Sequence, residues 1–252
     1  MTSWLGLEGR SVLVAGAGGL GSACSTALAV AGARVVIVDV DEGRLELAQK
    51  TVRAEGYDVE LVTADLTTAG ACREAVREAS SILGGLDVLV HAVGMNDRRP
   101  VLETTDEVWE QLMTVNLGSA FWIGQAAGRL MCANRQGRIV YISSVSGMLA
   151  HLNHAPYAAS KGGLNQMMKV MAREWAASGV TVNAVAPGYT ETDLTRAYLD
   201  KPGMRADMTS LVPAGRLGTV EDVVGPVLFL VSEQAAFVTG HVMYVDGGRV
   251  LV

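Results

Sequence analysis

A tyrosine and a lysine four residues apart, Tyr157 and Lys161, lie on one face of a helix if this part of the chain is helical. A phenol ionises near pH ~10, which is too high for an acid–base catalyst at neutral pH. A neighbouring ammonium favours the phenolate, so we expect Lys161 to lower the pKa of Tyr157. Ser144 lies upstream, where it could hold a substrate oxygen over the phenol. The alternative is a tyrosine packed on a lysine stem, because this pair alone often occurs by chance.

A second group of residues with possible chemistry is a glycine turn that begins at residue 16. It follows an apolar run, residues 11–15, and precedes a helix of small residues that ends near residue 31. Glycines at Gly16, Gly18 and Gly21 give the pattern G-x-G-x-x-G between a strand and a helix, with Gly19 and Leu20 between the last two. Such a turn brings backbone N–H groups close to the pyrophosphate of a dinucleotide.

An acidic residue, Asp39, ends the next predicted strand, residues 34–38, about 20 residues after the glycines. A carboxylate there accepts hydrogen bonds from the two hydroxyls of an adenosine ribose and repels the extra phosphate of NADP. Val40 follows it, and neither Arg nor Lys stands there or in the glycine turn. The sequence therefore favours NAD over NADP, although a solvated acid at a strand end would look the same.

The elements that must position these residues alternate along the whole chain. The pattern predicts further strands at residues 59–63, 88–92, 138–142, 181–186 and 242–245, and helices at 43–55, 69–83, 118–133 and 156–177. This alternation is typical of an α/β fold, a single-domain, Rossmann-type, doubly wound parallel sheet of about seven strands flanked by helices. We expect residues 1–252 to form one dinucleotide-binding and catalytic domain. Residues 189–215 form the least regular stretch and are expected to cover the substrate.

Composition excludes several classes of protein. The net charge is −6 and no basic block stands out, so nucleic acid and anionic membrane surfaces are not expected as partners. The three cysteines are scattered, which argues for free thiols in a reducing compartment and against a disulfide framework or a metal site. The uncharged stretch 12–33 contains several glycines and lacks a basic start, unlike a signal peptide. We therefore expect a cytoplasmic protein.

The ordered set of motifs resembles the short-chain dehydrogenase/reductase family over essentially the whole chain. Its most specific parts are Ser144 thirteen residues before Tyr157, the Tyr157/Lys161 pair, and the stretch 182–188 that ends in Pro187-Gly188. A terminal Val-Asp-Gly-Gly completes the set. Among members of the family, the chain resembles 3-oxoacyl-carrier-protein reductases and gluconate 5-dehydrogenase-like enzymes.

The resemblance implies a role for each matching residue. Tyr157 is expected to be the general acid or base, and Ser144 to bind the substrate oxygen. Lys161 is expected to lower the pKa of Tyr157 and bind the nicotinamide ribose, and Asn116 to hold a water that passes protons to solvent. The residues expected to bind the cofactor are Gly16, Gly18, Gly19, Leu20, Gly21, Asp39, Val40, Asp65, Leu66, Ala92, Val93, Gly94, Tyr157, Lys161, Pro187, Gly188, Thr190 and Thr192.

Two stretches depart from the family's pattern. Ala15 replaces a threonine before the glycine turn, and the spacing after Gly16 is one residue shorter. We expect the turn to bind with a slightly altered pyrophosphate contact. The family's Asn-Asn-Ala-Gly is His91-Ala92-Val93-Gly94 here, so the central strands need other bracing. We interpret His91 as a buried, hydrogen-bonded core histidine, which could provide that bracing, and not as a catalytic residue.

Other residues near the predicted site bear on the substrate. His151, His154 and Tyr189 border the expected substrate position, and contact of His154 with substrate is weighed against an exposed loop histidine. Any of four arginines could also favour an anionic substrate, and the sequence does not tell which of them point inward: Arg98, Arg99, Arg196 and Arg205.

The leading hypothesis is an NAD(H)-dependent oxidoreductase for a secondary alcohol or ketone, with a polyol, hydroxy acid or small cyclic alcohol as substrate. One alternative is a 3-oxoacyl-carrier-protein reductase; these enzymes generally prefer NADP and carry a pair of docking arginines, of which only Arg135 is matched because Ser178 stands at the other position. Another is a non-catalytic NAD-binding sensor or assembly protein. The resemblance also implies a homotetramer, or a dimer, with the nearly uncharged segment 118–130 in an interface.

Overall fold

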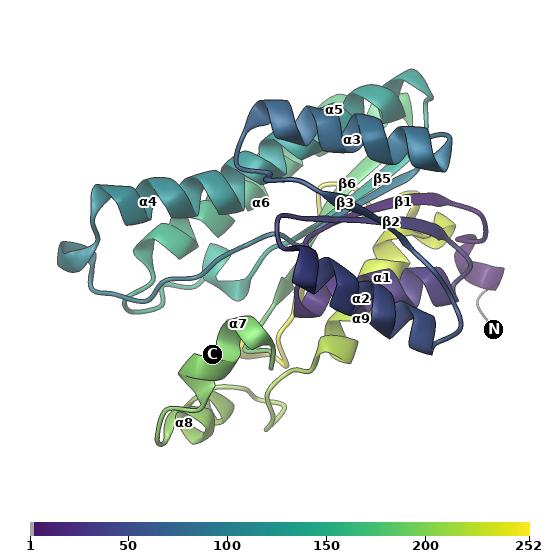
Figure 1. Cartoon of the computed structure of the whole chain (residues 1–252). Coiled ribbons are helices and arrows are strands. Elements are labelled where there is room, and N and C mark those ends of the chain that lie inside the picture. Colours follow the sequence, from purple (N-terminus) through teal and green to yellow (C-terminus); the bar gives the residue numbers. More distant parts are fainter. Residues whose placement is uncertain (1–2) are drawn as a thin grey trace.

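Seven apolar segments form one parallel sheet in the computed structural model, which describes residues 3–252 (Figure 1). The strands are β1 (Ser11–Ala15), β2 (Arg34–Asp39), β3 (Glu60–Thr63), β4 (Val88–His91), β5 (Gly137–Ile142), β6 (Val180–Pro187) and β7 (Val242–Val245). Their order across the sheet is β3-β2-β1-β4-β5-β6-β7, and every neighbouring pair is parallel. The predicted doubly wound fold is therefore confirmed, with each strand within a residue or so of its expected bounds.

Helices cover both faces of the sheet (Figure 1). On one face lie α3 (Ala69–Leu83), α5 (Ser119–Ala133) and α6 (Ala155–Trp175), and on the other lie α1 (Gly19–Val30), α2 (Glu42–Ala54) and α9 (Val220–Val231). The helix α4 (Asp106–Met113) precedes α5. No helix in residues 3–252 has the length and apolar character needed to cross a bilayer.

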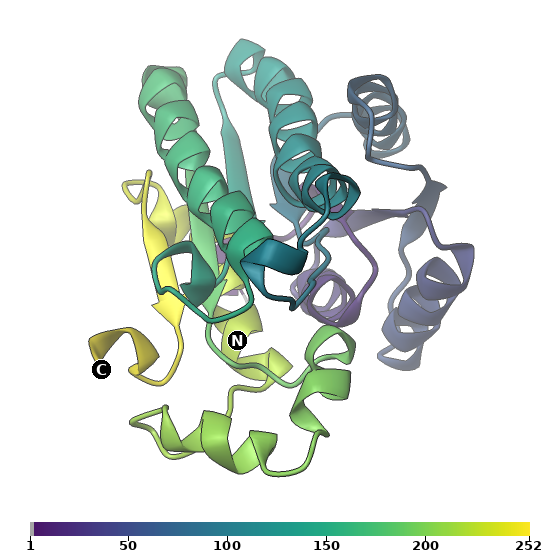
Figure 2. The same cartoon turned by 90° about the vertical axis from the view of Figure 1, so that its left-hand side faces the viewer.

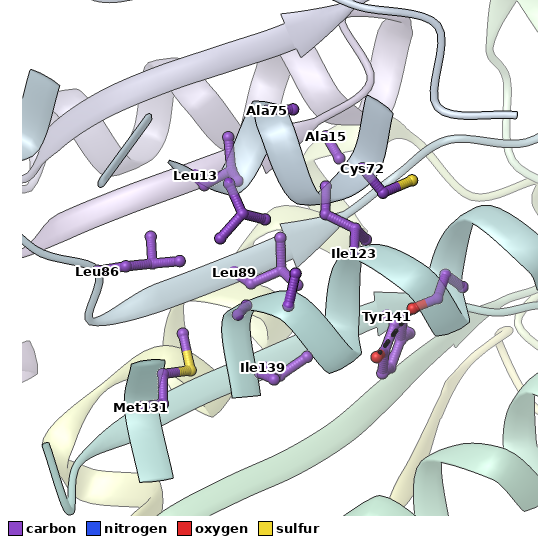
Figure 3. Close-up of a cluster of buried hydrophobic side chains, with 14 of the residues drawn as sticks. Leu13, Ala15, Cys72, Ala75, Leu86, Leu89, Ile123, Met131, Ile139 and Tyr141 are labelled. Carbon is purple, nitrogen blue, oxygen red and sulfur yellow. Dashed lines mark hydrogen bonds between the residues drawn. The ribbon is translucent and has the colours of Figure 1, made fainter. Parts of the chain in front are cut away.

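The central strands are buried on both faces because alternate side chains enter two separate cores. Leu13 and Ala15 of β1 pack with α3 and α5, whereas Val12 and Val14 pack with α1 and α9. Figure 3 shows the first of these cores, where the buried Tyr141 hydroxyl donates to the Ala120 carbonyl oxygen at 3.2 Å. This explains why the strands are nearly continuous apolar runs in the sequence.

The stretch 189–215 is more regular than predicted. It contains two short helices, α7 (Asp193–Leu199) and α8 (Met204–Ser210), which project beyond the carboxyl ends of the strands (Figures 1 and 2). The expectation of an irregular segment was wrong because capping chemistry creates these helices locally. Thr192 and Thr195 form a reciprocal cap at the start of α7, and Gly203 adopts a left-handed conformation directly before α8.

Two buried polar side chains brace the sheet, one of them at the stretch 91–94 where the family pattern is altered. His91 is fully buried at the end of β4, and its Nε2 lies 2.9 Å from the Ser119 hydroxyl of α5. The interpretation of His91 as a hydrogen-bonded core residue is thus confirmed. Asn183, in the stretch 182–188, donates to the Val238 carbonyl and accepts from the His241 N–H, so it ties β6 to the chain entering β7.

Burial of His91 makes the stability of the protein depend on pH. Desolvation, assisted by the charge of Lys161, lowers the pKa of His91 to about 3 in the folded state, whereas an unfolded histidine has its ordinary value of 6.5. Between these values the unfolded state binds more protons, so stability falls as the pH drops below 6.5. At pH 5 the expected loss from one such histidine is about 2 kcal/mol.

We therefore expect His91→Asn to reduce the loss of stability between pH 7 and pH 5 by about 2 kcal/mol. The measurement is the free energy of unfolding in urea at the two pH values. The exposed His241 provides the control, since His241→Gln should leave the pH dependence unchanged. An unchanged pH dependence in His91→Asn would contradict the prediction, whatever its absolute stability.

Candidate active site

The glycine turn joins β1 to α1 at the carboxyl edge of the sheet, and its three pattern glycines meet different demands. Gly16 has a φ of 101°, which strongly favours glycine. At Gly21 a Cβ would lie 1.8 Å from the Gly16 carbonyl oxygen, so helix and turn touch there. A Cβ at Gly18 would meet nothing within 4 Å. The turn is therefore tightly packed at Gly21 and leaves free space at Gly18, as a pyrophosphate-binding turn requires.

Asp39 lies beside this turn at the end of β2. Its Oδ2 accepts from the Ala17 N–H at 2.7 Å and its Oδ1 from the Asp41 N–H at 3.0 Å, and only 9% of the residue is exposed. The neighbouring Val40 is largely exposed. At the end of β3, Asp65 is exposed and accepts from the Thr67 N–H, whereas Leu66 is buried. The residues expected at the adenine end therefore share one edge of the sheet.

The residues expected at the nicotinamide end flank the point where the strand order reverses. β4 pairs with β1, and Ala92 donates to the Ala15 carbonyl at 2.7 Å, which places residues 92–94 opposite the glycine turn. A Cβ at Gly94 would come within 3.7 Å of the Lys161 Nζ. In open α/β sheets, ligands bind at such a reversal.

The segment after β6 reaches the same place. Pro187 ends β6, and Gly188 packs so closely on Asp246 that a Cβ would lie 2.9 Å from its Cα. Thr190 is buried, and Thr192 lies within van der Waals reach of Gly19 in the glycine turn. The start of α7 therefore faces the turn across the predicted cofactor site, while a hollow beside Gly188 and Tyr189 leads under the segment 212–218.

Ser144, Tyr157 and Lys161 converge between β5 and α6. The Ser144 side chain lies close enough to the Tyr157 hydroxyl to favour its ionised form. Pro156 in the first turn of α6 fixes the start of the helix that carries Tyr157 and Lys161. The Lys161 Nζ donates to the Ile142 carbonyl at 2.8 Å and lies 5.7 Å from the centre of the Tyr157 ring. Both side chains are buried.

The ionisation of this group differs from the sequence expectation. Burial raises the pKa of Tyr157 above its ordinary value, and the Ser144 hydrogen bond and the Arg98 charge only oppose this rise. Burial also lowers the pKa of Lys161 to about 8. The expectation that Lys161 lowers the pKa of Tyr157 was therefore wrong for the protein without cofactor. The reason is that a buried phenolate loses its hydration, and the ammonium points to the Ile142 carbonyl.

Asn116 lies in a π-helical turn, Thr114–Gly118, between α4 and α5. Its Oδ1 accepts from the Met95 N–H at 2.8 Å, and its Nδ2 donates to the Met95 carbonyl at 3.0 Å and to the Ser160 hydroxyl at 3.1 Å. The side chain thus clamps the segment after β4 to the helix of Tyr157. Turns of this kind occur frequently at functional sites.

The loop histidines face the site and are not both exposed. His154 is 2% exposed and stacks on the Tyr157 ring, with centroids 4.6 Å apart. Its Nε2 lies 2.5 Å from the Asn96 Oδ1, so this nitrogen carries a proton and Nδ1 is an acceptor. The Ser146 hydroxyl lies between the two histidines, 2.9 Å from His151 Nδ1 and 3.4 Å from His154 Nδ1. This arrangement packs a neutral imidazole on the ring of Tyr157.

Of the four arginines singled out from the sequence, Arg98 turns toward the site. Its Cζ lies 4.0 Å from the centre of the Tyr198 ring of α7, and its charge lowers the pKa of Tyr189 against the larger effect of burial. Arg99 is engaged by Asp97 at 2.5 and 2.6 Å, and Arg205 pairs with Glu191 on the surface. The side chain of Arg196 is exposed at its helix surface.

Sequence reasoning missed four residues of this region: Asn96, Ser146, Tyr198 and Arg249. Asn96 and Ser146 lie within one or two residues of predicted site segments, so proximity was the only signal for them. Arg249 directly follows the terminal Asp246-Gly247-Gly248, and its charge acts on His151 and Tyr189. Among residues 3–252, no group of three or more His, Cys, Asp or Glu side chains is arranged to hold a metal ion.

Comparison with known proteins agrees with this geometry. A family model described as Enoyl-(Acyl carrier protein) reductase matches residues 14–249. The 3-oxoacyl-[acyl-carrier-protein] reductase of Escherichia coli K12 is 37% identical over 98% of this chain and 100% of its own length. The chain belongs to the short-chain dehydrogenase/reductase family.

Other members of the short-chain dehydrogenase/reductase family at similar distance act on sugar acids. The gluconate 5-dehydrogenase of Gluconobacter oxydans 621H is 36% identical over 96% of this chain and 95% of its own. The crystal structure of a gluconate 5-dehydrogenase from Burkholderia cenocepacia J2315, in complex with NADP and tartrate, superposes with a TM-score of 0.92 at 36% identity, covering 97% and 96% of the two chains. Membership of this family establishes the fold of the protein and its class as an oxidoreductase.

Proposed function

We propose that the protein transfers a hydride reversibly between NAD(H) and a secondary alcohol or ketone, with a polyol, hydroxy acid or small cyclic alcohol as substrate. The observation that carries this proposal is the buried pair Tyr157 and Lys161, with the Lys161 Nζ 5.7 Å from the Tyr157 ring and Ser144 acting on the Tyr157 hydroxyl, near the reversal point of the sheet. The open glycine turn, the carboxylate of Asp39 and the buried ammonium fit a dinucleotide. The nicotinamide, when bound, supplies or accepts the hydride.

The protein's own residues handle the proton and the substrate oxygen. In reduction Tyr157 donates its proton to the carbonyl oxygen, and in oxidation it accepts the proton of the alcohol. Ser144 holds the same oxygen while charge develops on it. Lys161, whose pKa lies at about 8, exchanges its proton close to neutral pH, and we propose that Asn116 keeps this end of the site in register.

The proposed preference for NAD rests on Asp39. Its buried carboxylate accepts from the Ala17 N–H beside the predicted ribose position, where it would repel a 2′-phosphate. On α2, Arg44 is engaged by Asp41 at 3.4 Å, so this guanidinium is drawn to another carboxylate. A related gluconate 5-dehydrogenase binds NADP. The proposed preference for NAD therefore rests on the residues of this chain and not on the family.

We expect NADH to bind about ten-fold or more tightly than NADPH, because one repulsive unit charge at close range costs more than ~1 kcal/mol. In Asp39→Asn the ratio of the two dissociation constants should fall by about ten-fold. Quenching of protein fluorescence on cofactor titration measures both constants. Glu46→Gln, which removes an exposed carboxylate from α2, is the control and should keep the ratio. Tighter binding of NADPH by the unaltered protein would contradict the argument.

A substrate panel tests the reaction itself. The protein is mixed with NAD and secondary alcohols, including gluconate, galactitol and cyclohexanol, and with NADH and the matching ketones, while absorbance of the reduced cofactor is followed. Turnover of acetoacetyl thioesters alone would favour an acyl-carrier reductase, which Arg135 does not support because its side chain is bonded to the Ala177 carbonyl. Cofactor binding without turnover of any compound would favour a sensor.

We also propose that the protein assembles as a homotetramer or dimer through α5 and α6. These helices expose Phe121 and Val170, which line a shallow apolar hollow with Met167 and Trp175. An apolar helix face of this kind is a common site of subunit contact. Segment 189–215, with α7 and α8, is proposed to cover the substrate.

A further inference from the structure

Three buried side-chain nitrogens without hydrogen-bond partners belong to residues that contact Tyr189 or act on it by their charge. They are Arg98 Nε, His151 Nε2 and Arg249 Nε; in residues 3–252 only two other buried side-chain polar atoms lack a partner. A buried donor that stays unpaired costs about 1–3 kcal/mol, so native structures rarely leave three together. The group therefore indicates a position where a ligand supplies the missing hydrogen-bond partners.

Tyr189 is the common neighbour of these three side chains. Arg98 lies close enough to Tyr189 to act on its pKa, and the His151 ring lies 5.6 Å from the Tyr189 ring. The charges of Arg98 and Arg249 both act on Tyr189 and on His151. Desolvation first, and then these two charges, hold the pKa of His151 below its ordinary value, so this imidazole is neutral. The positive charge of the pocket therefore comes from the two arginines.

The chain terminus is built to present Arg249. Asp246 accepts from the N–H groups of Gly248 and Val250 at 3.0 and 2.8 Å, which closes a tight turn. The Ala214 N–H donates to the Gly247 carbonyl and so fastens this turn to the segment after α8. The terminal turn, dark yellow in Figure 2, accordingly lies on the side of the molecule that carries α7 and α8.

Arg98 is fixed independently from the other side of the pocket. The Arg99 N–H donates to the Asn153 carbonyl, which joins the segment after β4 to the loop that carries His151. The Tyr198 ring packs against the Arg98 guanidinium. Asp97, the nearby carboxylate, is taken by Arg99. In the described part of the chain, neither Arg98 nor Arg249 forms a salt bridge with an Asp or Glu side chain; Arg249 Nη1 donates to the Val252 backbone oxygen at 2.9 Å.

We infer that Arg98, Arg249 and His151 form a subsite for the carboxylate of the substrate, an inference that rests on the proposed function and narrows its substrate class to hydroxy acids and their keto acids. The planar fork of a guanidinium matches a carboxylate in two parallel hydrogen bonds. Ser146 contacts His151 at Nδ1, which leaves Nε2 as the ring nitrogen free for a polar contact with the same ligand. A carboxylate held by these donors fixes the reacting carbon over Tyr157.

The test compares two ligands that differ only in charge, D-gluconate and D-gluconamide. Each is titrated by calorimetry into the full protein saturated with NADH, a combination in which an alcohol cannot be oxidised, so binding is measured without turnover. We expect gluconate to bind at least about ten-fold more tightly, because hydrogen bonds to charged groups are about twice as strong as neutral ones.

Two variants assign this preference to the arginines. Arg249→Gln and Arg98→Gln should each lower the ratio of the two dissociation constants by about ten-fold, and Arg249→Lys, which keeps the charge and loses the fork, should restore part of it. Arg129→Gln is the control, because it removes an exposed guanidinium of α5 that does not belong to this group; it should keep the ratio. Thermal unfolding checks that each variant is folded.

The inference is overturned if the unaltered protein binds both ligands equally, or if Arg249→Gln and Arg98→Gln keep the ratio. Tighter binding of inorganic phosphate than of gluconate would likewise overturn the assignment to a carboxylate. These outcomes differ from failure of the proposed function, which is absence of turnover on the whole alcohol and ketone panel while NADH still binds.

Discussion

Tyr157→Phe is expected to lower kcat by about a thousand-fold, because removal of a positioned general acid–base group typically costs 10²–10⁴ in rate. The phenylalanine ring keeps the stack on His154 and the packing of α6, so the folded site should persist. Only the hydroxyl that Ser144 contacts is lost. Turnover of the best substrate from the panel, at saturating NAD and across pH, measures this loss, and NADH titration should give a dissociation constant within about three-fold of the original.

Two further proteins make this result specific. Tyr57→Phe removes a hydroxyl from an exposed tyrosine outside the site and should turn over normally. Adding Ser144→Ala to Tyr157→Phe should lower kcat little further, because groups that act as one unit have strongly non-additive effects. Normal turnover by Tyr157→Phe would refute the role assigned to Tyr157, and additive losses would show that Ser144 acts independently of it.

The strands were predictable because the features that determine them lie within the strand sequences themselves. Val12 to Val14 and Val35 to Val38 are buried on both faces, so the sequence shows unbroken apolar runs, and the glycine turn and Asp39 mark where they end. The switch point followed from the order of these elements, which parallel sheets restrict strongly. His91 was also predictable, since a histidine inside an apolar strand has few alternatives to a paired core position.

Features that depend on tertiary burial were not predictable. Nothing local shows that the Tyr157 hydroxyl is desolvated enough to reverse the expected direction of its pKa shift. The start of α7 uses a threonine where a capping box usually has Glu or Gln, so the pattern hid the helix. The charge of Arg249 acts on His151 in a structure where the turn at residues 246–248 packs on residues 212–214, a contact between segments distant in sequence.

Gly21→Ala should have the largest effect on the folded state. The added Cβ would lie 1.8 Å from the Gly16 carbonyl oxygen, and both atoms belong to backbone that cannot swing aside as a side chain does. The start of α1 must move away from β1, which we expect to cost about 3 kcal/mol of the free energy of unfolding. Since the same shift opens the turn, NADH should bind at least about 100-fold more weakly, a loss of ~2.7 kcal/mol.

Gly18→Ala separates these two consequences because it alters the same turn on its open side. Gly18 has φ −69° and ψ 177°, which alanine adopts readily, and its Cβ would meet no protein atom within 4 Å. Stability should therefore stay within about 0.5 kcal/mol of the original. The methyl group occupies the space through which a pyrophosphate approaches, so NADH affinity should still fall about ten-fold. Urea unfolding without cofactor and NADH titration measure the two quantities. If Gly18→Ala bound NADH normally, the pyrophosphate would not lie against this turn, whereas equal destabilisation by both variants would contradict the close packing assigned to Gly21.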